Sequence, residues 1–142
     1  MIIALDLEGT LIRDQLDPRP RPHLYDFLTA LRWKSKRIVM MTAVPEENFR
    51  EIAWRLADQG AAPGWFAQLE YVLWERPHKD LLQIPGVKDK SETLLIADSE
   101  GYIHPEQKDR WVDIETFFDQ GDADQELARL TGLLLFGRKN GN

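Results

Sequence analysis

The stretch Ile2-Ile3-Ala4-Leu5-Asp6-Leu7-Glu8-Gly9-Thr10-Leu11, close to the start of the chain, decides the fold. Its first four residues are all apolar, which is typical of a strand covered on both faces of a parallel sheet. An acidic residue follows at once, and ligands of open α/β sheets gather outside the carboxyl ends of the strands. Gly9 allows a turn that a side chain would hinder, and it lets the backbone approach a ligand closely. We therefore expect a buried strand that ends in an acidic loop at the ligand-binding edge.

Short apolar runs alternate with longer amphipathic stretches along the rest of the chain, which predicts an α/β fold. Its expected form is a three-layer Rossmann-like domain with a mainly parallel central sheet. Pro22 is expected as the first helical residue of one helix, and Asp122 as the N-cap of the last one. Trp54 and Trp74 are assigned to buried faces. Further strands are expected at 37–42, 69–74, 93–98 and 111–114, and further helices from 45 to about 60 and at 79–84.

We predict a single domain over residues 1–136 and a disordered tail over 137–142. The chain has 142 residues, of which 43% are hydrophobic and 30% are charged, as is ordinary for a globular protein. It has no cysteine, which removes disulfides, thiolate metal sites and cysteine nucleophiles and fits a cytoplasmic protein.

The charge and hydropathy of the chain favour neither nucleic acid nor a membrane as partner. A net charge of −6 repels phosphate backbones at long range. Arg13, Arg19 and Arg21 lie close together, so a local basic patch stays open as an alternative. No apolar run approaches the roughly 20 residues that a membrane span requires.

Four residues with complementary chemistry fall near the predicted ends of strands. Asp6, Thr42 and Asp98 each close a strand, and Lys79 begins the helix after the third strand. Each of these residues is common in ordinary loops, so their order along the chain carries the argument. Two carboxylates at adjacent strand ends offer the oxygen ligands that magnesium prefers. A carboxylate can also attack phosphorus, while an ammonium and a hydroxyl hold the phosphate oxygens. The set therefore predicts phosphoryl transfer.

These residues, in this order, resemble the haloacid dehalogenase (HAD) superfamily of phosphatases. More narrowly, the chain is similar to the small capless branch that includes the NIF-like and RNA polymerase C-terminal-domain phosphatases. The residues from Arg21 to Leu28 resemble that branch's Arg-Pro-x-x-x-x-Phe-Leu helix start, and Lys79-Asp80-Leu81 resembles its lysine motif. The resemblance covers most of the chain. It implies a HAD-like catalytic domain without a large cap and a magnesium-dependent phosphomonoester hydrolase that works through an aspartyl-phosphate.

The resemblance also implies a role for each matching residue. Asp6 would be the nucleophile, and Glu8 would protonate the leaving oxygen and later activate water. An open site would admit a phosphorylated substrate such as a phosphoprotein or another large phosphoester. The implied phosphate-binding residues are Thr42, Ala43 and Lys79, and the implied Mg²⁺ ligands are Asp6, Glu8, Asp98 and Ser99.

Two positions depart from the family pattern. Glu8 replaces the usual aspartate, and Ser99 stands where the branch has Asp or Asn, with Glu100 next to it as a substitute ligand. Two alternatives therefore stay open: a catalytically weak binding module with the same fold, and a phosphotransferase with an alcohol acceptor. His78 is a further candidate for contact with phosphate because it precedes Lys79.

Overall fold

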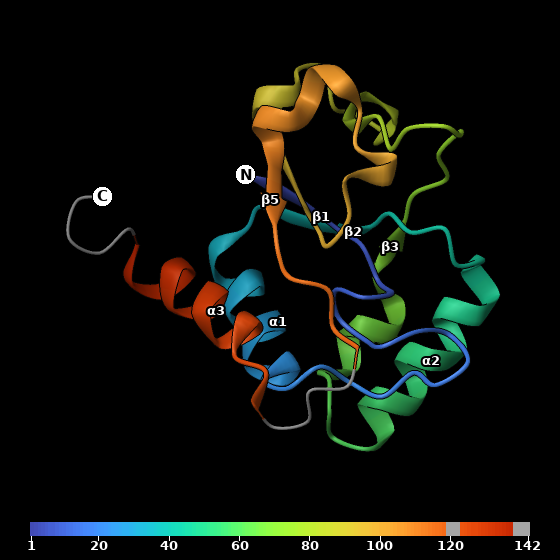
Figure 1. Ribbon diagram of the computed structural model, residues 1–142, viewed down its shortest axis with the longest axis vertical. Coiled ribbons are helices and arrows are strands. Elements are labelled where there is room, and N and C mark those ends of the chain that lie inside the picture. Colours follow the sequence, from blue (N-terminus) through green and yellow to red (C-terminus); the bar gives the residue numbers. More distant parts are fainter. Residues whose placement is uncertain (119–122, 138–142) are drawn as a thin grey trace.

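The computed structural model describes residues 1–118 and 123–137 and contains a parallel five-stranded sheet in the order β3-β2-β1-β4-β5 (Figure 1). In the central pairings, Ile2 of β1 lies opposite Arg37 of β2 and Thr93 of β4. This arrangement confirms the predicted α/β fold with a Rossmann-like three-layer architecture. The strands are β1 (Ile2–Leu5), β2 (Arg37–Met40), β3 (Glu70–Tyr71), β4 (Thr93–Ala97) and β5 (Trp111–Asp113).

Side chains of β1 alternate between two cores, one on each face of the sheet. Ile3 and Leu5 pack with the buried faces of the α-helices, whereas Ile2 and Ala4 pack with the chain between Val72 and Ile103. All four are at most 4% exposed, as the unbroken apolar run predicts. The α-helices are α1 (Leu24–Lys34), α2 (Glu46–Asp58) and α3 (Glu126–Phe136). Short 3-10 helices cover Gly64–Gln68, Leu81–Gln83, Lys90–Glu92, Glu100–Tyr102 and Pro105–Arg110.

Several predicted boundaries need correction. The third strand was expected at 69–74, but β3 has two residues, because the chain leaves the sheet after Tyr71: Val72 is buried in the second core, whereas Leu73 is exposed. The helix expected at 79–84 is a single 3-10 turn over Leu81–Gln83. Pro22 is not the first residue of α1, because His23 adopts a left-handed conformation with φ of 72° and the helix begins at Leu24.

Two further predictions concern Trp54 and the end of the chain. Trp54 is 62% exposed rather than buried, because Phe49, Ile52, Ala53 and Leu56 already fill the inner face of α2. Asp122 and residues 138–142 of the expected tail lie outside the described residues. The N-cap position of α3 is occupied by Gln125.

Two connections leave the carboxyl ends of β1 and β2, at the edge of the sheet where the sequence predicts ligand binding. Between β1 and α1 the chain makes a loop, and between β2 and β3 it makes α2 and one 3-10 turn. These stretches are fully described, and neither contains an inserted cap domain. None of the helices in the described residues is long and apolar enough to cross a membrane.

Candidate active site

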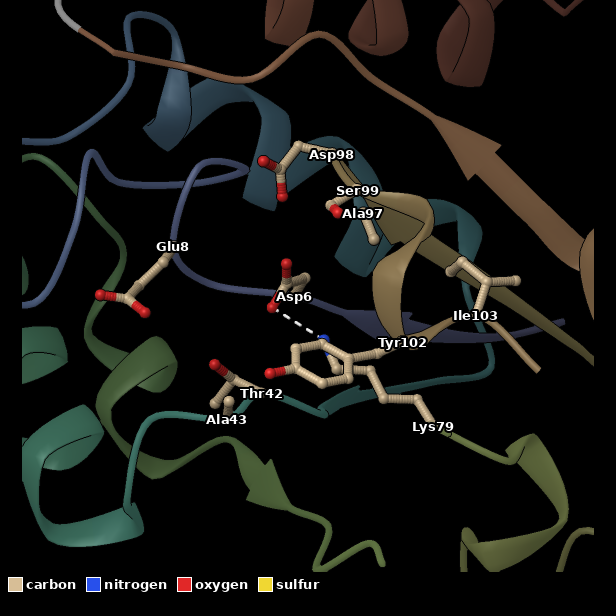
Figure 2. A pocket seen from close by; sticks show the side chains of 10 residues that line it. All are labelled: Asp6, Glu8, Thr42, Ala43, Lys79, Ala97, Asp98, Ser99, Tyr102 and Ile103. Carbon is tan, nitrogen blue, oxygen red and sulfur yellow. Dashed lines mark hydrogen bonds and ion pairs between the residues drawn. The ribbon is translucent and has the colours of Figure 1, made fainter. Parts of the chain in front are cut away.

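The candidate site lies where the strand order reverses, beyond the carboxyl end of β1. From β1 the chain builds β2 and β3 on one side and later β4 and β5 on the other, which is where ligands of open α/β sheets bind. The seven residues to which the resemblance assigns a role in catalysis, phosphate binding or metal binding all line one pocket there (Figure 2). The lining residues are Asp6, Glu8, Thr42, Ala43, Lys79, Ala97, Asp98, Ser99, Tyr102 and Ile103.

Asp6 and Lys79 form an ion pair at the centre of this pocket. Lys79 Nζ lies 2.9 Å from Asp6 Oδ1, and the two side chains are 3% and 15% exposed, respectively. Burial raises the pKa of Asp6 above its ordinary value, and the attraction of Lys79 opposes this rise. Lys79 reaches the pocket from an extended segment rather than a helix start, because its amide donates to the carbonyl of Tyr102 at 2.8 Å. The Lys79 ammonium therefore lies directly beside the Asp6 carboxylate.

Asp98 is held directly against the loop that follows Asp6. Its Oδ1 accepts from the Thr10 hydroxyl at 3.1 Å, and its Oδ2 accepts from the Thr116 hydroxyl at 2.9 Å. A Cβ at Gly9 would lie 2.3 Å from Asp98 Oδ2, and Gly9 has φ of +75°. Glycine is therefore required both for the turn and for the close approach. Sequence reasoning missed both threonines, because their contacts span 88 and 18 residues.

Thr42 lies two residues beyond the end of β2, and hydrogen bonds hold both its side chain and its carbonyl. Its hydroxyl accepts from the Val44 amide at 3.2 Å, and its carbonyl accepts from the indole N–H of Trp74 at 2.9 Å. The Tyr71 hydroxyl donates to the carbonyl of Val44. The loop that carries Thr42 and Ala43 is thus tied to the aromatic residues beside it.

Glu8 and Ser99 line the pocket, but each already has a hydrogen-bond partner. Glu8 Oε2 accepts from the Gln15 amide at 2.7 Å, and the carboxylate is directed away from Asp6 in Figure 2. Ser99 Oγ accepts from the Gly101 amide at 3.2 Å. Glu100, the substitute ligand suggested by the sequence, instead pairs with Lys108 at 2.7 Å.

The carboxylates of Asp6 and Asp98 could hold a magnesium ion that takes its remaining ligands from water and phosphate. Within residues 1–118 and 123–137, no three His, Asp or Glu side chains gather closely enough to hold a metal by themselves. Asp6 and Asp98 nevertheless supply carboxylates from adjacent strands, and a carboxylate oxygen with one hydrogen bond retains a further lone pair. Magnesium usually keeps several waters and takes one or two carboxylates from the protein.

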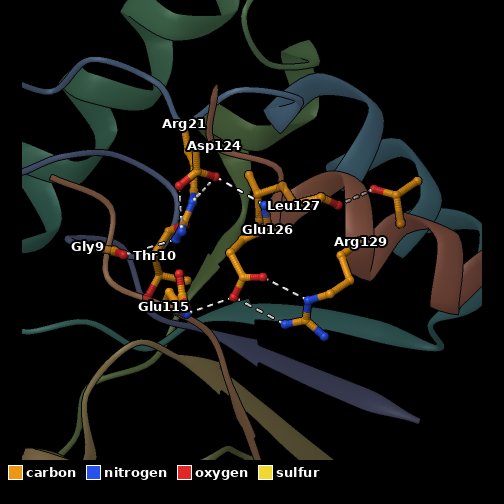
Figure 3. A network of polar contacts seen from close by, with 9 residues as sticks. Gly9, Thr10, Arg21, Glu115, Asp124, Glu126, Leu127 and Arg129 are labelled. Atoms are coloured by element: carbon orange, nitrogen blue, oxygen red, sulfur yellow. Dashed lines mark hydrogen bonds and ion pairs between the residues drawn. The ribbon is translucent and has the colours of Figure 1, made fainter. Parts of the chain in front are cut away.

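A buried arginine fixes the other side of the loop that follows Asp6 (Figure 3). Arg21 is fully buried and donates from Nε and Nη2 to the two oxygens of Asp124, each at 2.9 Å. Its Nη1 donates to the carbonyls of Gly9 and Thr10, each at 3.2 Å. The sequence suggested this arginine only as part of a helix-start motif or a basic patch. Its contacts instead attach the loop to the segment that enters α3.

The arginines of the basic patch that the sequence allowed as an alternative are each paired with an acidic side chain. Arg13 and Arg19 both pair with Asp17, at 3.1 and 2.8 Å. His78 is not among the residues that line the pocket, and its ring lies 5.4 Å from that of His104.

Comparison with known proteins adds no assignment to this geometry. No family model and no curated protein matches the chain.

Proposed function

We propose that this protein is a magnesium-dependent phosphatase that hydrolyses phosphomonoesters through an aspartyl-phosphate on Asp6. The observation that carries the proposal is the buried pair of Asp6 and Lys79, with Thr42 and Asp98 in the same pocket at the switch point of the sheet. A carboxylate nucleophile beside a fixed cation suits attack on a phosphate dianion, because the cation offsets the repulsion between two anions. The resemblance to the HAD superfamily points to the same chemistry.

In the first step, an oxygen of the Asp6 carboxylate attacks phosphorus. A bond from Asp6 to phosphorus forms, the bond from phosphorus to the leaving oxygen breaks, and Glu8 gives that oxygen a proton. Lys79 and the Thr42 hydroxyl hold the non-bridging oxygens, on which negative charge is spread in the transition state. Lys79 needs little movement, since it lies 2.9 Å from the nucleophile.

In the second step, the Glu8 carboxylate removes a proton from water, and the water oxygen forms a bond to phosphorus. The bond between phosphorus and Asp6 breaks, which releases inorganic phosphate and restores the carboxylate. Glu8 must leave the Gln15 amide to perform either transfer. Bound near Asp6, Glu8, Asp98 and Ser99, magnesium would supply neutralisation of the phosphate charge.

A catalytically weak binding module is the second candidate. The hydrogen bond from the Gln15 amide holds Glu8 away from Asp6, and both oxygens of Asp98 already accept hydroxyl hydrogen bonds. Such a protein would retain phosphate binding without turnover. Phosphotransfer shares the first step of the phosphatase reaction and replaces water with an alcohol in the second.

The test is phosphate release from a panel of aryl and alkyl phosphates by the purified protein, with and without magnesium. We expect magnesium-dependent release that Asp6→Asn reduces to background, whereas Asp58→Asn, at the exposed end of α2, behaves as wild type. Absence of release across the panel, or equal release by Asp6→Asn, contradicts the proposal. Binding of beryllofluoride without turnover would favour the binding module. A phosphorylated alcohol formed with added acceptor would identify phosphotransfer.

A further inference from the structure

A second hollow adjoins the candidate active site and shares two of its walls. Thr42 and Ala43 line both spaces. The second hollow has a volume of about 160 Å³, and a cavity of about 150 Å³ in a protein can hold one benzene ring. A substrate with its phosphate against Thr42 can therefore extend a single ring into this space. Its lining residues are Thr42, Ala43, Tyr71, Val72, Leu73, Trp74 and Arg76.

Aromatic side chains form walls of this hollow, and hydrogen bonds fix them to the loop over residues 42–44, which carries the proposed phosphate ligands. The Trp74 indole donates to the Thr42 carbonyl at 2.9 Å, and the Tyr71 hydroxyl donates to the Val44 carbonyl. Trp74 also packs edge-on against Tyr102, with ring centroids 5.3 Å apart. These rings lose little freedom when a ligand binds, which favours stacking of a planar group.

Arg76 gives the hollow a positive rim. Its guanidinium lies 5.6 Å from the ring centre of Trp74 and 5.1 Å from that of Tyr102, and Nη1 donates to the Tyr102 hydroxyl at 2.7 Å. Arg76 is exposed, and within the described ranges it forms no ion pair with an acidic side chain. Its remaining N–H donors are thus available to an anion, and a planar fork suits a carboxylate.

We propose that this hollow is a subsite for the leaving group and that it selects an aromatic ring carrying a carboxylate. The ring would pack against Trp74 and Tyr71, and its carboxylate would pair with Arg76. This inference rests on the proposed phosphatase function, since it assigns the phosphate to the pocket of Asp6 and Lys79. The fixed cation at the rim also attracts such an anion to a protein whose net charge is −6.

The test measures binding rather than turnover, with phosphonates that Asp6 cannot cleave. Calorimetry in magnesium buffer would compare methylphosphonate, benzylphosphonate and 4-carboxybenzylphosphonate. We expect the ring to tighten binding and the carboxylate to tighten it by a further factor on the order of five, the scale of one exposed ion pair. Arg76→Gln should remove the gain from the carboxylate. The matched control is Arg32→Gln, which removes an exposed arginine stacked 4.8 Å from the Trp65 ring centre, outside either hollow.

The possible results separate the subsite from the phosphatase function. Equal affinities for the three phosphonates, no binding of any of them, or an unchanged carboxylate gain in Arg76→Gln would overturn the subsite. Preferred binding without release of phosphate from 4-carboxyphenyl phosphate would retain the subsite and refute the phosphatase. Release of phosphate from this ester, with equal affinities for the three phosphonates, would support the phosphatase and overturn the subsite. A peptide with phosphonomethylphenylalanine beside aspartate forms a further arm. Tighter binding by 4-carboxybenzylphosphonate than by the peptide would support a carboxylate on the ring itself, whereas tighter binding by the peptide would overturn that ligand in favour of a protein tyrosine with an acidic neighbour.

Discussion

Replacing Arg21 by methionine removes the charge that joins the loop after Asp6 to the segment that enters α3. The substitution keeps most of the side-chain volume, so its main effect is electrostatic. The Asp124 carboxylate is 4% exposed and would lose both guanidinium donors, retaining the hydrogen bond from the Glu126 amide. The carbonyls of Gly9 and Thr10 would each lose a donor as well.

The expected cost is large because the abandoned charge is buried. Removing one partner of a buried ion pair costs about 3–5 kcal/mol, out of a total stability of about 5–15 kcal/mol for a domain. The corresponding fall in Tm is about 10–20 °C for a chain of this size. Urea unfolding followed by circular dichroism would measure the free energy of unfolding directly.

Two control variants make this experiment specific. Arg55→Met breaks an exposed ion pair, in which the side chains of Arg55 and Glu51 are 63% and 64% exposed. This variant should lose less than about 1 kcal/mol of unfolding free energy. The double variant Arg21→Met with Asp124→Leu should recover much of the loss, because no unpaired charge remains. The reasoning is refuted if Arg21→Met costs no more than Arg55→Met, or if the double variant is the least stable of all.

Three further predictions concern the pocket itself. Gly9→Ala should cost about 1–3 kcal/mol and reduce phosphate release, because the added Cβ meets Asp98 and the left-handed backbone is strained; urea unfolding and a phosphate assay measure both effects. Thr10→Val should destabilise the fold by about 1–3 kcal/mol in the same assay, since the Asp98 amide loses its acceptor. In magnesium-free buffer, an NMR titration of the Asp6 carboxyl should give a pKa above 3.8, and Lys79→Met should raise it further. Because burial favours the protonated form of Asp6, its contribution to stability should fall as pH rises from 3.8 through the folded-state pKa. A lower Asp6 pKa in Lys79→Met than in the wild type would contradict the assignment of Lys79 as the group that opposes the rise.

The central part of the fold could be predicted because β1 is wholly apolar and β2 and β4 are apolar after their first residue. A run such as Ile2–Leu5 is buried on both faces, so its composition alone distinguishes it from a surface segment. The run at 69–74 misled the prediction, since its apolar residues serve different ends. Val72 is buried in the second core, Leu73 is 80% exposed, and the Trp74 indole donates to the carbonyl of Thr42.

Asp6, Thr42 and Asp98 could be predicted as pocket residues because each closely follows a central strand whose position the sequence shows. Lys79 was placed correctly in the pocket but on the wrong element, since it lies in an extended segment rather than at a helix start. The residues that hold the pocket in place by hydrogen bonds and ion pairs could not be predicted, because they come from distant parts of the chain. Arg21 and Asp124 are 103 residues apart, and Thr10 and Asp98 are 88 apart. No local pattern records such a pairing. Trp54 shows a related difficulty, because helical spacing does not fix where the buried face of α2 ends.

The most direct test of the phosphatase proposal is to trap the phosphoryl group on the protein. Rapid acid quenching of the reaction with a labelled aryl phosphate, followed by peptide mapping, would locate a covalent intermediate. We predict label on the peptide that contains Asp6, and conversion of Asp6 to homoserine when the quenched protein is reduced with borohydride. Phosphate release at the full rate with no label on Asp6, or with label on another residue, would contradict the mechanism.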